Sequence, residues 1–566
     1  MKYSFFFKFL PCISFLATSF CGYGQGKVLP VSINVNLMQN QGTIPPVWAF
    51  FGYDEANYTY MKDGSKLLTE LAALRPGSVY IRCHNMLTSG NGIPGLKWSS
   101  TNAYTEDVNG NPVYNWHIVD SIFDSYVKRG MKPLAEIGFM PEALSITPGS
   151  ETGEAFIDGK KHYSGWAYPP KDYKKWAELV YQWVRHSVQR YGKSEVESWY
   201  WEVWNEPDLT FYWKGTPEEY IKLYDYTADA VKRALPTAKV GGPETTSPDG
   251  GSGGEYIRKF LTHIVSGTNN VTGKIGAPLD FISFHAKGFP KLIDSVEWMN
   301  VGHQLSSIDI GFEIVSSIPS LKNLPVIIGE SDPDGCAACA ADQHPEYAYR
   351  NSTMYAVYTA EAMSRTYDLA KKRGINLAGA VTWGFEFENQ PYFRGFRDLA
   401  TNGIDKPVLN VFRMFGMMQG NRVEAVSSSK QNYITIRDSS VRGQEPDVNA
   451  YAAKSRNSAT VMVWNYHDKN DINFPPTPVS VTVTGLPKQR VLLTQYIIDK
   501  ENSNSFTAWK KMGSPQTPTP DEYKILEAAG QLKEAYSPKY ITPVNGKTKI
   551  DFDLERQGIT LLKITW

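Results

Sequence analysis

A glutamate closes one of the most aromatic stretches of the chain, WYWEVWNEPD at residues 199–208. The apolar residues suit a buried strand, and Pro207, which has no backbone donor, ends that strand directly after Glu206. Burying a carboxylate without a partner is costly, so a glutamate at the end of a hydrophobic strand is expected to have a chemical task. We predict that Glu206 is a catalytic acid.

A second glutamate, Glu330, ends the apolar stretch LPVIIGE at residues 324–330. Cleavage of a glycoside generally uses two carboxyl groups on either side of the scissile bond, one to protonate the leaving oxygen and one to attack the sugar or activate water. A single glutamate at a strand end is more often structural, but Glu206 and Glu330 together favour a catalytic pair. Glu136 and Glu244 are weaker candidates to accept hydrogen bonds from sugar hydroxyls.

Short apolar segments alternate with helical ones between residues 46 and 423, as in a parallel sheet. Eight strands over this length favour a (β/α)8 TIM barrel, which builds its active site at the carboxyl ends of its strands. Glu206 and Glu330 then end strands 4 and 7. A doubly wound open sheet is the alternative, although no glycine fingerprint follows the first strand. The predicted strands are residues 47–51, 78–82, 132–137, 198–203, 239–242, 280–284, 325–328 and 377–382.

Two helices between these strands have clear signals. Residues 172–191 keep one apolar face, with large side chains at helical spacing. The sequence TPEE at 216–219 offers an N-cap, a proline at the first helical position and a glutamate at the third, which predicts a helix that ends before Pro236.

The chain changes character at about residue 424, where helical spacing gives way to alternating and β-branched segments. Residues 459–466, 479–484, 491–498, 548–554 and 559–566 are predicted strands of a β-sandwich that spans residues 424–566. Residues 25–45 include an alternating strand that we expect to join this sandwich. A short helix is predicted at residues 521–534, inside a long connection.

The first 24 residues have the pattern of a secretory signal peptide, with lysines before and around an apolar run. We therefore expect export to the periplasm or the medium. Cys21 also permits a lipoprotein anchor, but Phe20 stands where a lipobox needs a small residue, so anchoring is the lesser alternative. No other stretch is apolar enough to span a membrane.

Composition narrows the class of partner. The formal net charge is zero, which argues against binding nucleic acid through phosphate contacts, and aromatic residues make up 13% of the chain, which suits a protein that packs rings against sugars. Cys336 and Cys339 form a CAAC pair without further ligands at zinc-site spacing, so a disulfide is favoured over a metal site or free thiols. We expect no metal.

Five separated motifs resemble glycoside hydrolase family 39, whose members include β-xylosidases and α-L-iduronidase. They extend, with their flanks, from about Pro46 to Met418. The resemblance is strongest to bacterial β-xylosidases, notably in NYTYMKDG (57–64) and TNAYTE (101–106). The five motifs are YIRCHN (80–85), WNEPD (204–208), SFHAKG (283–288), GESDP (329–333) and TWGFE (382–386).

The resemblance implies a retaining mechanism in which Glu206 is the general acid/base and Glu330 the nucleophile. It implies that Asn205 contacts the sugar hydroxyl next to the anomeric carbon. The implied mechanism requires no cofactor. His84 and His285 are expected to bind hydroxyls or orient Glu330.

Other sugar contacts are expected from the end of the last strand and from the HAKG motif. Trp383 is expected to form an apolar floor under the sugar, while Glu386 and Glu388 are candidates to accept hydrogen bonds from hydroxyls. Lys287 resembles a carboxylate-binding lysine of the iduronidase branch, but it could equally bond a neutral hydroxyl or pair with an acidic neighbour.

The sequence thus favours an exo-acting retaining β-xylosidase that removes xylose from xylo-oligosaccharides. An α-L-arabinoside-cleaving enzyme or an iduronidase is the alternative within the family, and a non-catalytic carbohydrate-binding barrel is a distant one. The oligomeric state stays undetermined.

Overall fold

The computed structural model describes residues 1, 29–149, 163, 165–471 and 473–566. The predicted signal peptide, including Cys21, lies almost entirely outside these residues. Within the described ranges, no helix is both long and apolar enough to cross a membrane.

Eight parallel strands close into a barrel in the order β12-β13-β2-β3-β6-β7-β8-β9. This confirms the predicted TIM barrel and excludes the open doubly wound sheet. Each predicted strand is present, although β2 begins at Phe50 rather than at residue 47 and several strands extend further at their carboxyl ends. The strands are β2 (Phe50–Tyr53), β3 (Tyr80–Cys83), β6 (Lys132–Ile137), β7 (Tyr200–Val203), β8 (Lys239–Thr245), β9 (Phe281–Lys287), β12 (Pro325–Asp332) and β13 (Asn376–Trp383).

The helices that connect these strands start and stop where the sequence indicates. Asp172 caps α3 by accepting hydrogen bonds from two backbone N–H groups, and Thr216 and Glu219 form a capping box at the start of α5. The larger barrel helices are α1 (Lys62–Leu74), α2 (His117–Val127), α3 (Tyr173–Tyr191), α5 (Pro217–Ala234), α6 (Ser252–Ser266), α7 (Val301–Ser316), α8 (Thr353–Arg373) and α9 (Pro407–Met417).

The C-terminal part forms one continuous mixed sheet in the order β21-β20-β24-β18-β17-β16-β1-β19-β23, with β22 also paired to β20. The N-terminal strand β1 joins it as predicted, antiparallel to β16 and parallel to β19. The strands are β1 (Val31–Thr43), β16 (Asn421–Ser427), β17 (Asp447–Lys454), β18 (Ser458–Tyr466), β19 (Thr477–Thr484), β20 (Val491–Ile498), β21 (Lys533–Glu534), β22 (Lys539–Ile541), β23 (Lys547–Leu554) and β24 (Ile559–Thr565).

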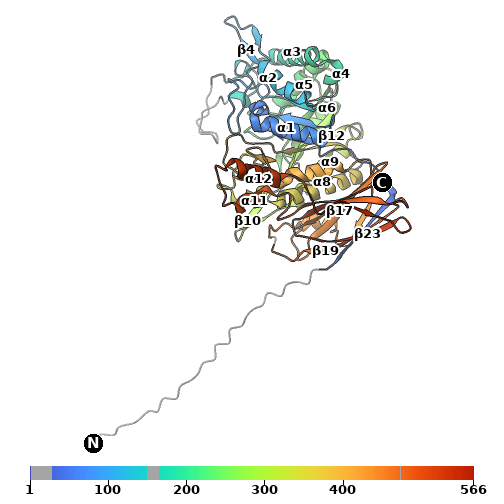
Figure 1. The fold of residues 1–566 in the computed structure, drawn as a ribbon. Coiled ribbons are helices and arrows are strands. Elements are labelled where there is room, and N and C mark those ends of the chain that lie inside the picture. The colour runs from blue at the N-terminus through green and yellow to red at the C-terminus, as the bar shows by residue number, and fades with distance from the viewer. Residues whose placement is uncertain (2–28, 150–162, 164, 472) are drawn as a thin grey trace.

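This sheet packs on the barrel through helix α8, which lies between the two in Figure 1. Strand β18 is buried on both faces: Met462 and Trp464 belong to the barrel-side core, while Val461 and Val463 belong to the core inside the sheet domain. The indole N–H of Trp464 donates to the Glu361 carboxylate of α8 over 2.7 Å. The two domains therefore share a buried polar contact inside an apolar interface.

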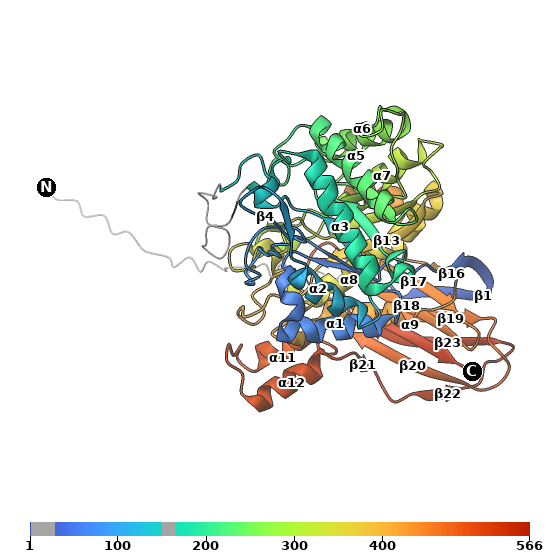
Figure 2. The ribbon, with the colours of Figure 1, turned by 90° about the horizontal axis from the view of Figure 1, so that it is seen from above.

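Two helices, α11 (Ser505–Lys511) and α12 (Pro520–Gly530), fill the connection between β20 and β21. The predicted helix at 521–534 is thus too long at its end, because residues 533–534 pair with β20 instead. Figure 2 shows the two helices beside α1 of the barrel. Trp509 and Leu526 from this pair pack against Phe393 and Ile404 of the barrel.

The polar contact between the domains makes stability depend on pH. Asp447 and Glu361 share the guanidinium of Arg365. Burial, followed by the charge of Glu361, raises the pKa of Asp447 to about 8. Because the pKa of an aspartate in the unfolded chain is about 3.9, the native state keeps this proton up to a higher pH than the unfolded state does. The contribution of the protonated Asp447 to the free energy of unfolding is therefore fully present below about pH 4, and it is lost as the pH rises through about 8.

We expect the stability difference between Asp447→Asn and wild type to shift in favour of the variant between pH 5 and pH 8, since the amide cannot ionise. Urea unfolding at several pH values measures it, with Asp553→Asn on the exposed face of β23 as the control. A pH-independent difference would contradict the raised pKa.

Candidate active site

A buried arginine, Arg82 of β3, lies at the centre of the polar groups inside the barrel mouth. Its side chain is fully buried. The guanidinium contacts Glu202 over 2.5 Å, Glu136 over 2.8 Å and Glu330 over 3.4 Å. A fourth carboxylate, on Glu244, lies 3.6 Å away. One cation thus joins carboxylates from strands β6, β7, β8 and β12.

Arg82 and Glu202 are not among the site residues predicted from the sequence. Both stand inside apolar strands, and a charged residue in such a strand is a usable signal, since a buried charge needs a partner. The partners come from other strands, so the signal identifies buried charges without showing which ones meet. Burial raises the pKa of Glu202 well above its usual range, although the Arg82 charge acts against this shift.

The two predicted catalytic carboxyl groups meet at one imidazole. His285 Nδ1 lies 2.8 Å from Glu206 Oε1, and its Nε2 lies 2.9 Å from Glu244 and 3.9 Å from Glu330. The register of the barrel pairs His285 directly with Glu330. Strands 4 and 7 therefore bring Glu206 and Glu330 to the same site, as the sequence predicted.

The backbone around Glu206 is strained in the way that functional sites often are. Trp204, Glu206 and Glu244 all have positive φ values, of 72°, 40° and 55°. Such conformations are unfavourable for residues with a Cβ and persist only where the surrounding structure enforces them. The N–H of Glu206 donates to the carbonyl of Glu244 over 2.8 Å, which fixes this turn.

The charges around Glu330 keep it ionised. Burial raises its pKa, but His285, Lys287 and Arg82 together outweigh burial and hold the pKa well below the usual range. Burial lowers the pKa of His285, while the charges of Glu330 and Glu244 raise it to about 10. The site thus pairs a carboxylate with an imidazolium at neutral pH. A carboxylate suits a nucleophile.

Lys287 adopts one of the three roles that the sequence left open. Its ammonium lies 2.5 Å from Glu330 and 2.7 Å from Asp332. In this structure the lysine is therefore paired with acidic neighbours.

A histidine and a tryptophan form one side of the site. His84 contacts Glu136 over 2.6 Å and Asp54 over 3.3 Å, and its ring lies 4.4 Å from that of Trp383. Trp383 ends β13 and is almost fully buried, with the Arg82 guanidinium 4.9 Å from its ring. The predicted floor of the site and the predicted histidine thus lie together.

Asn205 has one amide atom in use and one available. Its Oδ1 accepts a hydrogen bond from Arg82 over 2.9 Å, which orients the amide. Its buried Nδ2 has no hydrogen-bond partner among the residues that the structure describes. A buried donor without a partner is costly, so it is suited to a ligand oxygen.

The two glutamates after β13 are placed differently. Glu386 borders a cleft shared with Trp383 and Asp54, and its Oε2 lacks a partner within the described part of the chain. Glu388 instead accepts hydrogen bonds from the first backbone N–H groups of α1, those of Asp63 and Gly64, over 3.0 and 2.8 Å. The structure therefore brings Glu386 to the edge of the site and gives Glu388 a helix-capping position.

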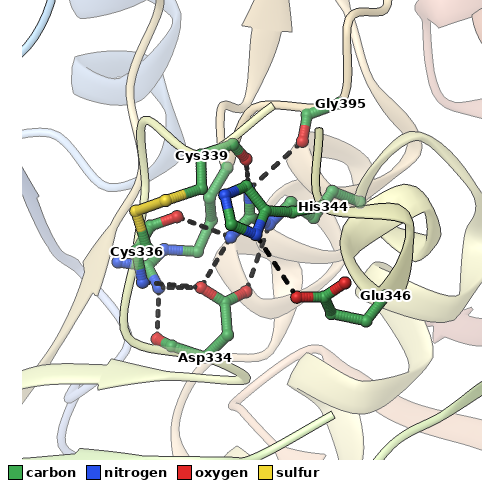
Figure 3. The surroundings of a disulfide bond; sticks show 8 residues. Asp334, Cys336, Cys339, His344, Glu346 and Gly395 are labelled. Atoms are coloured by element: carbon green, nitrogen blue, oxygen red, sulfur yellow. Dashed lines mark hydrogen bonds and ion pairs between the residues drawn. A yellow bond between two sulfur atoms is a disulfide. The ribbon is translucent and has the colours of Figure 1, made fainter. Parts of the chain in front are cut away.

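The predicted disulfide is present. Cys336 and Cys339 are bonded in the loop after β12, with their Cα atoms 5.5 Å apart (Figure 3). Cys83 is a buried free thiol. In the described residues no group of histidine, cysteine and acidic side chains could hold a metal ion.

A closed parallel barrel with paired carboxyl groups at its mouth is the architecture of many glycoside hydrolases. The sequence model of the family described as "Glycosyl hydrolases family 39" matches residues 31–548, and the chain belongs to this family. It is a glycosidase, which excludes the non-catalytic alternative.

The relatives point to two activities within the family. The chain is 27% identical over 552 residues to a β-xylosidase of Caldicellulosiruptor saccharolyticus, covering 95% of this chain and 98% of that one. It is 24% identical over 372 residues to an α-L-iduronidase of Mus musculus, covering 62% and 56%. A monomeric β-xylosidase from Caulobacter crescentus CB15 has the same fold, with a TM-score of 0.73 and 21% identity over 94% of this chain and 99% of that one.

The contact between Lys287 and Glu330 predicts a change in pH dependence. We expect Lys287→Met to raise the pKa of Glu330 and to move the acid limb of kcat/KM up by roughly one pH unit, because a neighbouring cation is removed. Because the wild-type limb lies well below the usual carboxylate range, initial rates on an aryl glycoside are measured from about pH 1.5 to pH 8, with circular dichroism at each pH to verify that the protein is folded. Lys291→Met, on the exposed strand β10 (Lys291–Ile293), is the control. An unchanged acid limb would show that Lys287 does not set this ionisation.

Proposed function

We propose that the protein is an exo-acting retaining β-xylosidase that releases xylose from the non-reducing ends of xylo-oligosaccharides. The observation that carries this proposal is the meeting of Glu206 and Glu330 at His285. The β-xylosidase relatives that match nearly the whole chain support the choice of sugar.

In the first step Glu330 attacks the anomeric carbon while Glu206 gives its proton to the leaving oxygen. The glycosidic bond breaks and a covalent bond forms between the sugar and Glu330. In the second step Glu206, now a carboxylate, takes a proton from water, and the hydroxide displaces Glu330. Both substitutions invert the anomeric carbon, so the configuration is retained overall.

The neighbouring residues support this sequence of steps. His285 donates to Glu206 Oε1 and so fixes the orientation of the acid. The free Nδ2 of Asn205 is suited to the hydroxyl beside the anomeric carbon, where hydrogen bonds strengthen as the transition state develops. Trp383 offers its ring to the apolar face of the sugar.

The ion pairs of the site favour a neutral sugar. Lys287 is held by two carboxylates, so its charge is already compensated before substrate binds. Arg82 is buried among carboxylates in the same way. An α-L-arabinoside-cleaving enzyme remains the nearest alternative, because arabinopyranose and xylose differ in one hydroxyl. The iduronidase relatives make an acidic sugar the second alternative.

The enclosure of the site supports exo action. Trp98, Trp166 and Tyr212, from the segments that follow β3, β6 and β7, line a narrow cleft beside His84. Walls of this kind suit the end of a chain better than its middle.

Export of the protein is also part of this proposal. The apolar N-terminal pattern and the disulfide both fit an oxidising compartment outside the cytoplasm. Attachment through Cys21 is the lesser alternative.

A panel of aryl glycosides tests the proposed specificity. The panel contains the β-xyloside, α-L-arabinosides, β-glucoside, β-galactoside and α-L-iduronide, each assayed with wild type. We expect the highest kcat/KM on the xyloside. Faster turnover of an arabinoside or the iduronide would transfer the assignment to that sugar.

Variants of the two carboxyl groups test their roles. We expect Glu330→Ala to lower kcat by about a thousandfold or more, because it removes the nucleophile. Glu206→Ala should be rescued by azide, giving a glycosyl azide of retained configuration. The surface variant Glu255→Ala in α6 is the control. Wild-type rates for Glu330→Ala, or an azide product of inverted configuration, would refute the proposed mechanism.

A further inference from the structure

The loop that carries the disulfide also carries a buried aspartate, Asp334, between two buried arginines. Asp334 accepts hydrogen bonds from Arg350 over 2.6 and 3.1 Å and from Arg397 over 2.8 Å. All three side chains are essentially buried. Figure 3 shows Asp334 near the disulfide of Cys336 and Cys339, with dashed lines that mark the interactions of its carboxylate.

The disulfide closes the peptide segment that these arginines hold. Arg350 donates to the carbonyl oxygens of Cys336 and Cys339, each over 2.7 Å. The backbone N–H of Arg397 donates to the carbonyl of Ala337 over 2.9 Å. The sulfur bridge therefore restricts two carbonyl groups that orient the Arg350 guanidinium and a third that holds the backbone of Arg397.

Arg397 connects this loop to the floor of the sugar site. Its Nε donates to the carbonyl of Trp383 over 2.8 Å, and its Nη2 lies 3.6 Å from Asp332. Asp332 in turn accepts the N–H of Trp383 over 2.9 Å and the ammonium of Lys287 over 2.7 Å. The peptide groups of Trp383 are thus held on both sides.

The same contacts reach the nucleophile. Lys287 bridges Asp332 and Glu330. A continuous set of hydrogen bonds and ion pairs therefore runs from the disulfide loop through Arg397 and Asp332 to Lys287 and Glu330. Neither Asp334 nor Arg397 contacts Glu206 or Glu330 in the interactions of the described residues.

We propose that Arg397, fixed by Asp334 and the disulfide loop, is a positioning residue that sets both Trp383 and the Lys287–Glu330 pair for catalysis. It acts on binding through the tryptophan floor and on chemistry through Lys287. The inference rests on the proposed function, because glycoside turnover is its readout.

The guanidinium is suited to this task because it presents several donors in a fixed plane. Arg397 uses them on three acceptors, the carbonyl of Trp383 and the carbonyl and carboxylate of Asp334, and it also forms an ion pair with Asp332. A lysine at this position keeps the charge but cannot satisfy three acceptors with the same geometry. Arg397→Lys therefore separates positioning from charge compensation.

The experiment compares Arg397→Lys with a matched variant, Arg365→Lys. Arg365 is also a buried arginine that pairs with two acids, but at the interface between α8 and the C-terminal sheet. We expect Arg397→Lys to raise KM and lower kcat, each by about threefold or more, on the best aryl glycoside. Arg365→Lys should keep kcat and KM within about twofold of wild type, even when its thermal midpoint falls as far as that of Arg397→Lys.

A second variant keeps the proposal testable if Arg397→Lys does not fold. Cys336→Ser/Cys339→Ser frees the loop while leaving both arginines in place, and we expect KM to rise by about twofold or more. Wild-type kcat and KM in both Arg397→Lys and the double variant would overturn the proposal, as would equal kinetic losses in Arg365→Lys. If wild type cleaves no member of the glycoside panel, the proposed function itself fails.

Discussion

The barrel mouth depends on the burial of one guanidinium, that of Arg82, among carboxylates from four strands. Each of these groups is too costly to bury alone, and removing one partner of such a pair typically costs about 3–5 kcal/mol. Arg82 therefore requires Glu136, Glu202 and Glu330 to be near, and they require Arg82. The relative placement of strands β3, β6, β7 and β12 follows from this mutual need.

The same arrangement prepares the chemistry. Glu330 is largely buried, so nearby charges act strongly on it, and the cations His285, Lys287 and Arg82 keep it ionised. The same imidazole, that of His285, holds Glu206 through a hydrogen bond. One polar network thus ionises Glu330 and orients Glu206, which are the states that the proposed mechanism requires of the nucleophile and the acid.

The barrel and the meeting of Glu206 with Glu330 at its mouth could be predicted because their signals are local. Buried parallel strands are continuous apolar runs, and a glutamate at the end of such a run is conspicuous, as Glu206 and Glu330 show. The ion pair between Arg82 and Glu202 could not be predicted from the sequence, because it depends on how the strands are arranged in the barrel. Glu388 shows the same limit. Because it stands two residues after Glu386, the two side chains are expected to point the same way, but the Glu388 carboxylate instead accepts hydrogen bonds from backbone N–H groups at the start of α1.

The proposed retaining mechanism depends most directly on the identity of the nucleophile. A 2-deoxy-2-fluoro glycoside of the preferred sugar, with a good leaving group, slows hydrolysis of the covalent intermediate enough for peptide mass mapping. We expect one label per chain, on the peptide that contains Glu330 and on that carboxylate. A label on Glu206 or Glu244, or no label from an enzyme that turns over the parent glycoside with inversion, would contradict it.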